Sequence, residues 1–189
     1  PFGNSPTLTY NNTSGSGQAN IANSGIVKLG TGTATFNVDG SLTNSGTING
    51  DTTSLVFGGN LTNESSVNLT SASTLDFSQY GGGGTGSLTN SASSTLTSSA
   101  SPTINIAGSL IIDTSSTFPA NATLTLDGTY AVSTSIDANG ITFSAVTLDR
   151  TFNTGSHRTL TINSGTVLPF GNSPTLTYNN TSGSGLGNL

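Results

Sequence analysis

The chain contains no cysteine, methionine or tryptophan, and only three of its 189 residues are lysine or arginine. Without cysteine it has neither a disulfide framework nor a thiolate metal site, which is compatible with an oxidising environment outside the cell. Eight acidic residues and a sequence pI near 4.1 leave no basic patch that could neutralise phosphates. The composition therefore argues against nucleic acid as a partner.

Long apolar runs are also absent, and the longest are short stretches such as Leu110-Ile111-Ile112. A membrane-spanning helix needs about 20 such residues, so we expect no membrane span. Threonine, serine and asparagine dominate the chain, whereas only 31% of it is hydrophobic and 6% is charged. This composition fits either disorder or an architecture with a thin apolar stripe per structural unit. A net charge of only −5, six prolines and many β-forming residues favour an all-β fold.

A long repeat organises the residues that are present. The stretch PFGNSPTLTYNNTSGSG from Pro1 to Gly17 returns unchanged from Pro169 to Gly185. Compositional bias does not produce so long an identity, so we interpret the chain as part of a tandem array. We predict one continuous domain over residues 1–189, in which residues 1–168 form a full period and residues 169–189 begin the next.

A shorter signature recurs within this period and reads, with one variant, Thr or Ser, apolar, any residue, apolar. Alternation with a period of two is typical of a short strand that turns its two apolar side chains to the same side. Eight copies occur in one period, which is the regular spacing expected of a repeat architecture. They lie at residues 35–38, 54–57, 74–77, 103–106, 123–126, 140–143, 159–162 and 175–178.

A second signature, Gly-x-Leu-Thr-Asn, places asparagine after a short strand at residues 40–44, 59–63 and 86–90, with a looser copy at 20–23. Asparagine tolerates a tight bend, and its amide can bond to the same residue in the copies above and below. We therefore predict a stacked amide ladder, which ends where Ile112 takes the corresponding position. Its members are Asn23, Asn44, Asn63 and Asn90.

Together these signatures predict a β-solenoid, or parallel β-helix, with about eight coils of roughly 21 residues per period. The spacings of three and four that mark an amphipathic helix are not sustained, and Gly, Ser, Thr and Asn are too dense for helix interiors. The predicted narrow core consists of Phe36, Leu55, Phe57, Leu75, Phe77, Ile104, Leu124, Phe143, Leu160 and Leu176.

The segments GSLTNSGTI at residues 40–48 and GNLTNESSV at residues 59–67 carry a resemblance to known proteins. They resemble the coils of filamentous-haemagglutinin-type adhesins and autotransporter passenger domains. The resemblance implies a right-handed β-helix in a secreted bacterial protein. It covers residues 20–126 best, and the chain departs from that pattern in its long, near-identical period and in lacking a recognisable secretion domain.

The sequence offers little catalytic chemistry. The eight acidic residues are spread at about one per predicted coil, whereas carboxylate catalysis requires them clustered. Asp149, Arg150, His157 and Arg158 form the one concentrated polar group, which we interpret as a solvated turn with ion pairs, an acidic-sugar site being the alternative. The glycine-rich stretch at 81–86 contains no acid and no EF-hand spacing occurs, so we predict no metal site, no cofactor and no catalytic residue.

The sequence permits N-glycosylation without requiring it, because Asn-x-Ser/Thr sequons are expected by chance in so Asn- and Thr-rich a chain. The candidate acceptors within the predicted coils are Asn60, Asn63, Asn68 and Asn121.

The function predicted from these features is that of a structural component of a microbial extracellular filament or surface fibre, a fibrous adhesin or stalk. Its main partner is itself, through adjacent repeats and laterally bundled filaments. One alternative is an adhesive module that binds surface glycans. Others are an ice-binding solenoid, an enzyme and a disordered stalk. The ice-binding alternative uses the Thr-x-Thr pairs Thr123/Thr125, Thr159/Thr161 and Thr175/Thr177.

Overall fold

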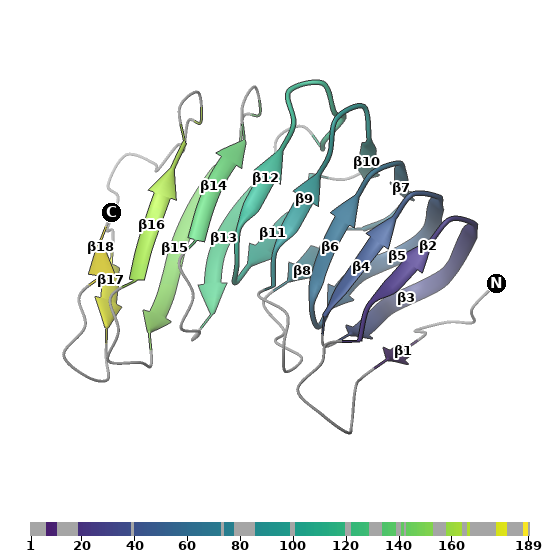
Figure 1. Ribbon diagram of the computed structural model, residues 1–189, viewed down its shortest axis with the longest axis horizontal. Helices are drawn as coiled ribbons and strands as arrows, with labels where there is room; N and C mark the ends of the chain where they lie inside the picture. The colour runs from purple at the N-terminus through teal and green to yellow at the C-terminus, as the bar shows by residue number, and fades with distance from the viewer. Residues whose placement is uncertain are drawn as a thin grey trace.

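Figure 1 shows the computed structural model of the chain, in which every element of the described part is a β-strand. The prediction of an all-β chain is confirmed. Within the described residues, no helix is long and apolar enough to cross a lipid bilayer. The structure describes residues 7–10, 19–38, 40–72, 74–77, 86–98, 101–119, 122–128, 134–138, 141, 143–152, 158–163, 166, 177–180 and 187–188.

The strands form two sheets in which every described pair is parallel. The path of the first sheet runs β1 (Thr7–Tyr10), β3 (Ile26–Val38), β5 (Thr47–Phe57), β8 (Thr74–Phe77), β11 (Thr103–Ile106), β13 (Thr123–Gly128), β15 (Ala145–Phe152) and β17 (Thr177–Asn180). The second sheet contains β2 (Ile21–Asn23), β4 (Ser41–Asn44), β6 (Asn60–Asn63), β9 (Leu88–Asn90), β12 (Leu110–Ile112), β14 (Thr134–Ala138), β16 (Arg158–Ile162) and β18 (Gly187–Asn188).

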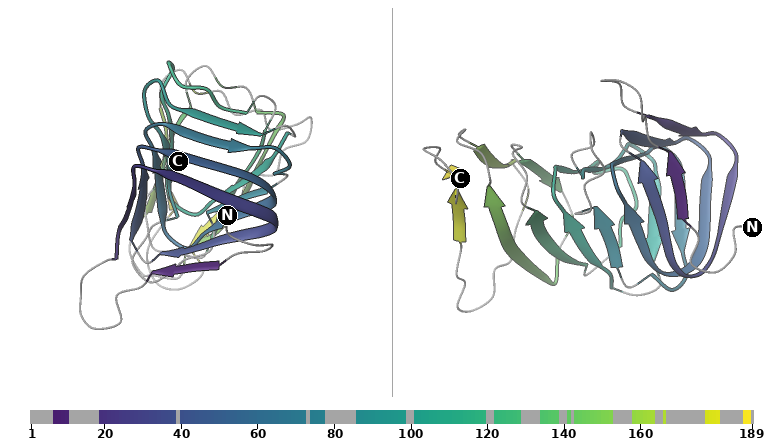
Figure 2. Two further views of the ribbon diagram at one scale, coloured as in Figure 1. Left: turned by 90° about the vertical axis from the view of Figure 1, so that its right-hand side faces the viewer. Right: turned by 90° about the horizontal axis from the view of Figure 1, so that it is seen from below.

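The chain moves repeatedly between the two sheets, and each strand pairs with the strand of the same sheet that the chain built on its previous pass (Figures 1 and 2). β3 and β5 are long because they continue around a corner. Residues 47–50 of β5 pair with β7 (Ser66–Leu69), whereas residues 54–56 pair with β8. β7 in turn pairs with β10 (Thr95–Ser98), so these segments add a third face between the two sheets.

Burial along the strands follows the alternation of the sequence. In β11 the side chains of Ile104 and Ile106 are buried while Thr103 and Asn105 are half-buried, and β4, β6, β7 and β8 show the same pattern. A strand has a side-chain period of two, so alternate residues face the interior. Each short strand thus contributes two inward side chains to a narrow core.

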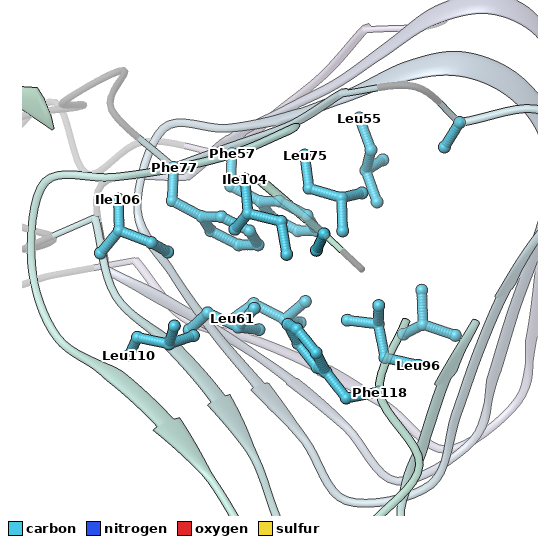
Figure 3. Close-up of a cluster of buried hydrophobic side chains, with 14 of the residues drawn as sticks. Leu55, Phe57, Leu61, Leu75, Phe77, Leu96, Ile104, Ile106, Leu110 and Phe118 are labelled. Atoms are coloured by element: carbon cyan, nitrogen blue, oxygen red, sulfur yellow. The ribbon is translucent and has the colours of Figure 1, made fainter. Parts of the chain in front are cut away.

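The core contains the predicted residues whose side chains the structure describes, each at most 2% exposed: Phe36, Leu55, Phe57, Leu75, Phe77, Ile104, Leu124 and Phe143. The side chains of Leu160 and Leu176 lie outside the described part. Figure 3 shows Phe57, Phe77 and Ile104 of the first sheet facing Leu61 and Leu110 of the second. The core also contains buried residues of the second sheet and third face that were not predicted, among them Leu42, Leu61, Leu88, Leu110, Ile48, Val67 and Leu96.

Two of the eight predicted strand signatures do not form strands of the first sheet. Ile141 and Phe143 are not in a strand, because β15 begins only at Ala145, where Val146 lies opposite the buried Leu124. The copy at 159–162 is a strand, but it belongs to β16 of the second sheet, which pairs with β14. The signature therefore marks short strands without distinguishing the sheets, since both sheets need the same alternation.

The register between β3 and β5 also differs from the alignment of the signatures. The signatures place Phe36 opposite Leu55, whereas the structure pairs Ala34 with Leu55 and Phe36 with Phe57. The register shifts on either side of Gly32, whose φ of 83° is readily adopted only by glycine. The result is a stack of three rings, with centroids 5.2 Å apart for Phe36–Phe57 and 4.9 Å apart for Phe57–Phe77.

The β5 residue opposite Gly32 carries a buried hydroxyl group without a partner. Thr52 is 0% exposed, and its hydroxyl oxygen has no hydrogen-bond partner within the described structure. An unpaired buried hydroxyl costs about 1–3 kcal/mol, so replacing Thr52 by the similarly shaped valine is expected to raise the free energy of unfolding by about 1 kcal/mol. Urea denaturation checks this, with Thr62→Val at a half-buried outer position as the control. A lower midpoint for Thr52→Val would show that the hydroxyl is satisfied.

Candidate functional site: a buried asparagine ladder

The most distinctive polar arrangement lies at the ends of four strands of the second sheet. β2, β4, β6 and β9 each end in asparagine, and the parallel register aligns Asn23 with Asn44, Asn44 with Asn63 and Asn63 with Asn90. Asn44, Asn63 and Asn90 are 0% exposed. These four residues, the asparagine ladder, are the ones that the Gly-x-Leu-Thr-Asn signature singled out.

Side-chain hydrogen bonds run along the ladder in one direction. Asn23 Nδ2 donates to Asn44 Oδ1 at 2.7 Å, Asn44 Nδ2 donates to Asn63 Oδ1 at 2.9 Å, and Asn63 Nδ2 donates to Asn90 Oδ1 at 2.8 Å. Asparagine carries two donors and an acceptor on one planar group, so a single residue type can repeat this contact at every step. In a buried row, such fully used amides rigidify the fold.

Each ladder amide also bonds to the backbone around the corner. Asn63 Nδ2 donates to the Thr95 carbonyl at 3.0 Å, and Asn44 Nδ2 donates to the Ser66 carbonyl at 3.0 Å. Asn23 and Asn90 make the equivalent contacts with the carbonyls of Thr47 and Thr117, at 3.4 and 2.9 Å. The ladder thus satisfies carbonyl groups where the chain turns from the second sheet to the third face, which buried backbone requires.

The ladder ends at Asn90 because Ile112 lies opposite it in β12. Serines replace the missing amide there. Asn90 Nδ2 donates to Ser116 Oγ at 3.0 Å, and Ser94 Oγ donates to Asn90 Oδ1 at 2.8 Å. Ser94 is itself buried, and its hydroxyl also bonds to the Ser91 carbonyl.

A second polar row at the start of the second-sheet strands was not predicted. Here the side chain of one strand accepts a hydrogen bond from the backbone N–H of a neighbouring strand. The contacts are Ser41 N to Asn20 Oδ1, Ser87 N to Asn60 Oδ1, Ser109 N to Ser87 Oγ and Ser135 N to Ser109 Oγ, at 2.8 to 3.1 Å. The sequence contained a signal for this row, because Ser or Asn directly precedes an apolar residue at the start of each of these second-sheet strands.

The polar group proposed around Asp149 and Arg158 is divided between the sheets. Asp149 and Arg150 lie in β15 of the first sheet, whereas Arg158 begins β16 of the second. Their side chains, and all of His157, lie outside the described part. Within the described residues, no cluster of three or more His, Cys, Asp or Glu side chains could hold a metal ion.

The surface of the described part includes the following open grooves. One of about 330 Å³ lies beside Gly50 at the third face, with Lys28, Asn49, Asp51 and Asn68 among its lining residues. The other, of about 450 Å³, lies over the outer side of β9 and β12, where Asp113 and Asp137 are among the lining residues. The second groove therefore has two carboxyl groups in its lining, whereas the first has one.

The sequon at Asn63 is a correction to the sequence analysis. Its amide is completely buried and hydrogen-bonded along the ladder, so the folded chain does not present it for glycosylation. Asn60 and Asn68 are half-buried, and Asn68 Nδ2 donates to Asn49 Oδ1 at 3.1 Å. Asn121 lies outside the described residues.

Hydroxyl groups surround two exposed carboxylates. Ser71 Oγ and Thr70 Oγ1 donate to Asp51 and hold the pKa of its carboxyl below the ordinary value of 3.8. The Ser115 hydroxyl and backbone N–H lower the pKa of Asp113 in the same way. A carboxyl with a lowered folded pKa stabilises the fold above its unfolded pKa, and this contribution disappears as the pH falls through the folded pKa.

Replacing Ser71 by alanine is therefore expected to raise the pKa of Asp51 toward 3.8, because the hydroxyl is the largest cause of the shift. The loss of stability that Asp51 contributes on acidification lies between its unfolded and folded pKa, so in the variant it should be smaller and should end at a higher pH. Carboxyl titration by NMR measures the pKa directly. Asp113 is the internal control, since its hydrogen bonds come from Ser115; equal shifts of both groups would contradict the assignment.

The fold and the ladder together define an all-β protein of successively paired parallel strands. This agrees with the strand architecture that the adhesin resemblance implies. Compared with protein-family models, with curated proteins and with solved structures, the chain shows no match.

Proposed function

We propose that the chain is a segment of a β-solenoid, and that it serves as a structural component of a microbial extracellular filament built from tandem copies of the period at residues 1–168. The observation that carries this proposal is the unbroken strand order of both sheets, in which each described strand pairs with strands of adjacent passes. Repeats of this kind gain stability from their neighbours, and they grow along one axis as repeats are added.

The interior supports a load-carrying role. Backbone pairing runs along both sheets, the asparagine ladder adds side-chain bonds in the same direction, and the three stacked rings of Phe36, Phe57 and Phe77 do likewise. All of these interactions join one pass of the chain to the next. Stretching the filament would have to break them together, which is the mechanical behaviour that a surface fibre requires.

The outer side of the first sheet supports lateral packing of filaments. One row of hydroxyl side chains follows the register across five strands, from Thr33 through Ser54, Thr74 and Thr103 to Thr123. With only 6% charged residues and a net charge of −5, the chain offers little repulsion to a second filament. Hydroxyl groups on such a face can bond across the contact without burying unpaired charge.

The ice-binding alternative gains no support from this face. The row beside the hydroxyl row passes from Thr35 to Val56, Asp76 and Asn105 before it reaches Thr125. Paired threonines would have to repeat on successive strands to form a regular Thr-x-Thr surface. The ordinary preference of threonine for strands explains those that are present.

Fibre diffraction from oriented, concentrated protein tests the proposal. A filament of parallel strands stacked along its axis is expected to give a meridional reflection at about 4.8 Å, from the general spacing of strands. Circular dichroism of the same sample should show β-structure that unfolds cooperatively. Absence of the reflection together with a random-coil spectrum would contradict the proposal and favour a disordered stalk.

A further inference from the structure

We propose that the outer edge of β17 is the docking edge for β3 of the next repeat, and that one period spans seven strand steps of the first sheet. The partner is thus a second copy of this chain's own repeat unit. This inference rests on the proposed function and adds the register in which successive repeats join.

The first observation is that one sequence occupies opposite edges of the first sheet. Thr9 and Tyr10 in β1 are the repeat equivalents of Thr177 and Tyr178 in β17. β1 pairs with β3, the strand that follows it in the sheet, whereas β17 pairs with β15, the strand that precedes it. The two strands lie at opposite ends of the array (Figure 1). A strand of this sequence can therefore pair on either edge.

The second observation is that the register of the first sheet returns to its starting residue. Six successive pairings connect Thr7 with Thr147, passing through Thr35, Val56, Asp76, Asn105 and Thr125. Two residues after Thr147, Asp149 pairs with Thr177, which follows Thr175 by the same two residues in the sequence. Thr175 is the repeat equivalent of Thr7, so the seventh step closes the period.

The return to the repeat equivalent is informative because the register of each strand pair is set independently of the registers of the other pairs. The sequence separation of paired residues varies from step to step, and the step from Thr7 to Thr35, for example, is longer than the step from Asn105 to Thr125. The steps nevertheless lead from one residue to its own repeat equivalent. β17 therefore presents its outer edge at the position that β1 has beside β3, and a following β3 can pair with Thr177 as it pairs with Thr9.

The second sheet reaches the same junction with a different register. Its path from Ile21 leads through Leu42, Leu61, Leu88, Leu110 and Ile136 to Ile162. β18, however, pairs Asn188 with Thr159, and Asn188 is the repeat equivalent of Asn20, the residue before Ile21. The path that leads to Ile162 corresponds to Thr161 for Asn20, so the pairing of Asn188 with Thr159 is displaced by two residues, an even shift that keeps the alternation of the strand. In this inference the register of the first sheet defines how successive repeats join, and the register of the second sheet shifts by two residues to fit that junction.

The register also changes the expected number of strand steps in one period, and with it the axial length of the period. Eight coils were predicted from the signatures, whereas the first sheet uses seven steps, because the signature at 159–162 belongs to the second sheet. Seven strand spacings of about 4.8 Å give an axial repeat of about 34 Å, against about 38 Å for eight. A difference of one strand spacing per period accumulates with each added repeat.

Chains extended by whole periods test this inference. Residues 1–168 are placed once, twice or three times before the complete chain of residues 1–189, and particle lengths are measured by cryo-electron microscopy. The control joins two complete chains through a flexible Gly/Ser linker after Leu189, which duplicates the junction segment instead of sharing it. We expect the extended chains to be single rods that lengthen by about 34 Å per period, and the linked control to show two bodies at variable angles.

Three results would overturn the inference. These are an increment of about 38 Å per period, extended chains that bend freely where the repeats meet, and an extended chain that unfolds at lower urea concentration than the single chain. None of them removes the reflection at about 4.8 Å expected of the strands themselves. Failure of the junction is therefore distinguishable from failure of the proposed solenoid filament.

Discussion

Replacing Asn63 by alanine is expected to lower the free energy of unfolding by about 2–4 kcal/mol. The side chain accepts a hydrogen bond from Asn44 and donates to both Asn90 and the Thr95 carbonyl, and it is completely buried. Removing it breaks three bonds and leaves buried polar groups facing a cavity. Urea denaturation of the complete chain, followed by circular dichroism, measures the change.

Asn68→Ala is the control, because Asn68 is an asparagine whose side chain also makes hydrogen bonds within a row, two against the three of Asn63. It donates to Asn49 and accepts from Thr97, but it is only half-buried. Water can replace the lost partners there, so a cost of about 1 kcal/mol or less is expected. Equal costs for the two variants would show that burial of the ladder contributes nothing to stability.

Asn63→Asp separates the hydrogen bonds from the shape of the side chain. An ionised carboxylate can still accept from Asn44, but it cannot donate to Asn90 Oδ1 or to the Thr95 carbonyl. Burial opposes its charge and raises its folded pKa above the ordinary value of about 3.9. The penalty of the charge is therefore largest above the folded pKa and disappears as the pH falls toward the unfolded pKa, whereas the loss of one of the two donated hydrogen bonds remains. A difference from the natural chain that is the same at pH 7 and pH 4 would contradict a buried, donating Asn63.

Phe57→Ala is expected to cost about 3–5 kcal/mol, as large-to-small changes of buried aromatic residues do. Phe57 is 1% exposed and is the middle ring of the stack, so its removal leaves a cavity between Phe36 and Phe77 and ends both ring contacts. Since the three rings come from successive strands of the first sheet, the loss weakens contacts between passes of the chain. The urea midpoint should fall accordingly.

Two further variants locate the cause of the Phe57 effect. Phe57→Leu keeps an apolar side chain of the kind found at Leu55 and Leu75, and it should cost about 1.5 kcal/mol or less beyond the lost ring stacking, itself worth about 0.5–1.5 kcal/mol. Val56→Ala changes the adjacent, half-buried outer position and should cost less than either. If Val56→Ala matched Phe57→Ala, the alternation of inner and outer side chains in β5 would be wrong.

The sequence predicted the ladder and the short strands at residues 35–38, 54–57, 74–77, 103–106 and 123–126, because both depend on short-range order. Alternation within each strand signature shows which side chains face inward, and Phe36, Leu75 and Ile104 are buried as it requires. Asparagine at the end of a short strand is a local signal for a corner, and its recurrence at Asn44, Asn63 and Asn90 identified the residues whose amides now form one hydrogen-bonded row.

The register between neighbouring strands depended on side-chain packing, about which the signatures carry no information. Sliding one strand by two positions along its neighbour leaves the same side chains facing inward, so alternation does not distinguish Phe36 opposite Leu55 from Phe36 opposite Phe57. The structure selects the second pairing, in which the rings stack and Gly32 accommodates the change of register.

The chain's composition and periodicity by themselves determined an all-β protein, its inward-facing residues and its repeated asparagines, because each of these follows from the conformation of a few neighbouring residues. Only the tertiary structure decided which sheet each strand joins and which residues of neighbouring strands pair. It placed residues 159–162, for example, in the second sheet. Those choices depend on contacts between segments that lie a whole pass of the chain apart, where side-chain shape and the path of the corners select one register among several that expose the same faces.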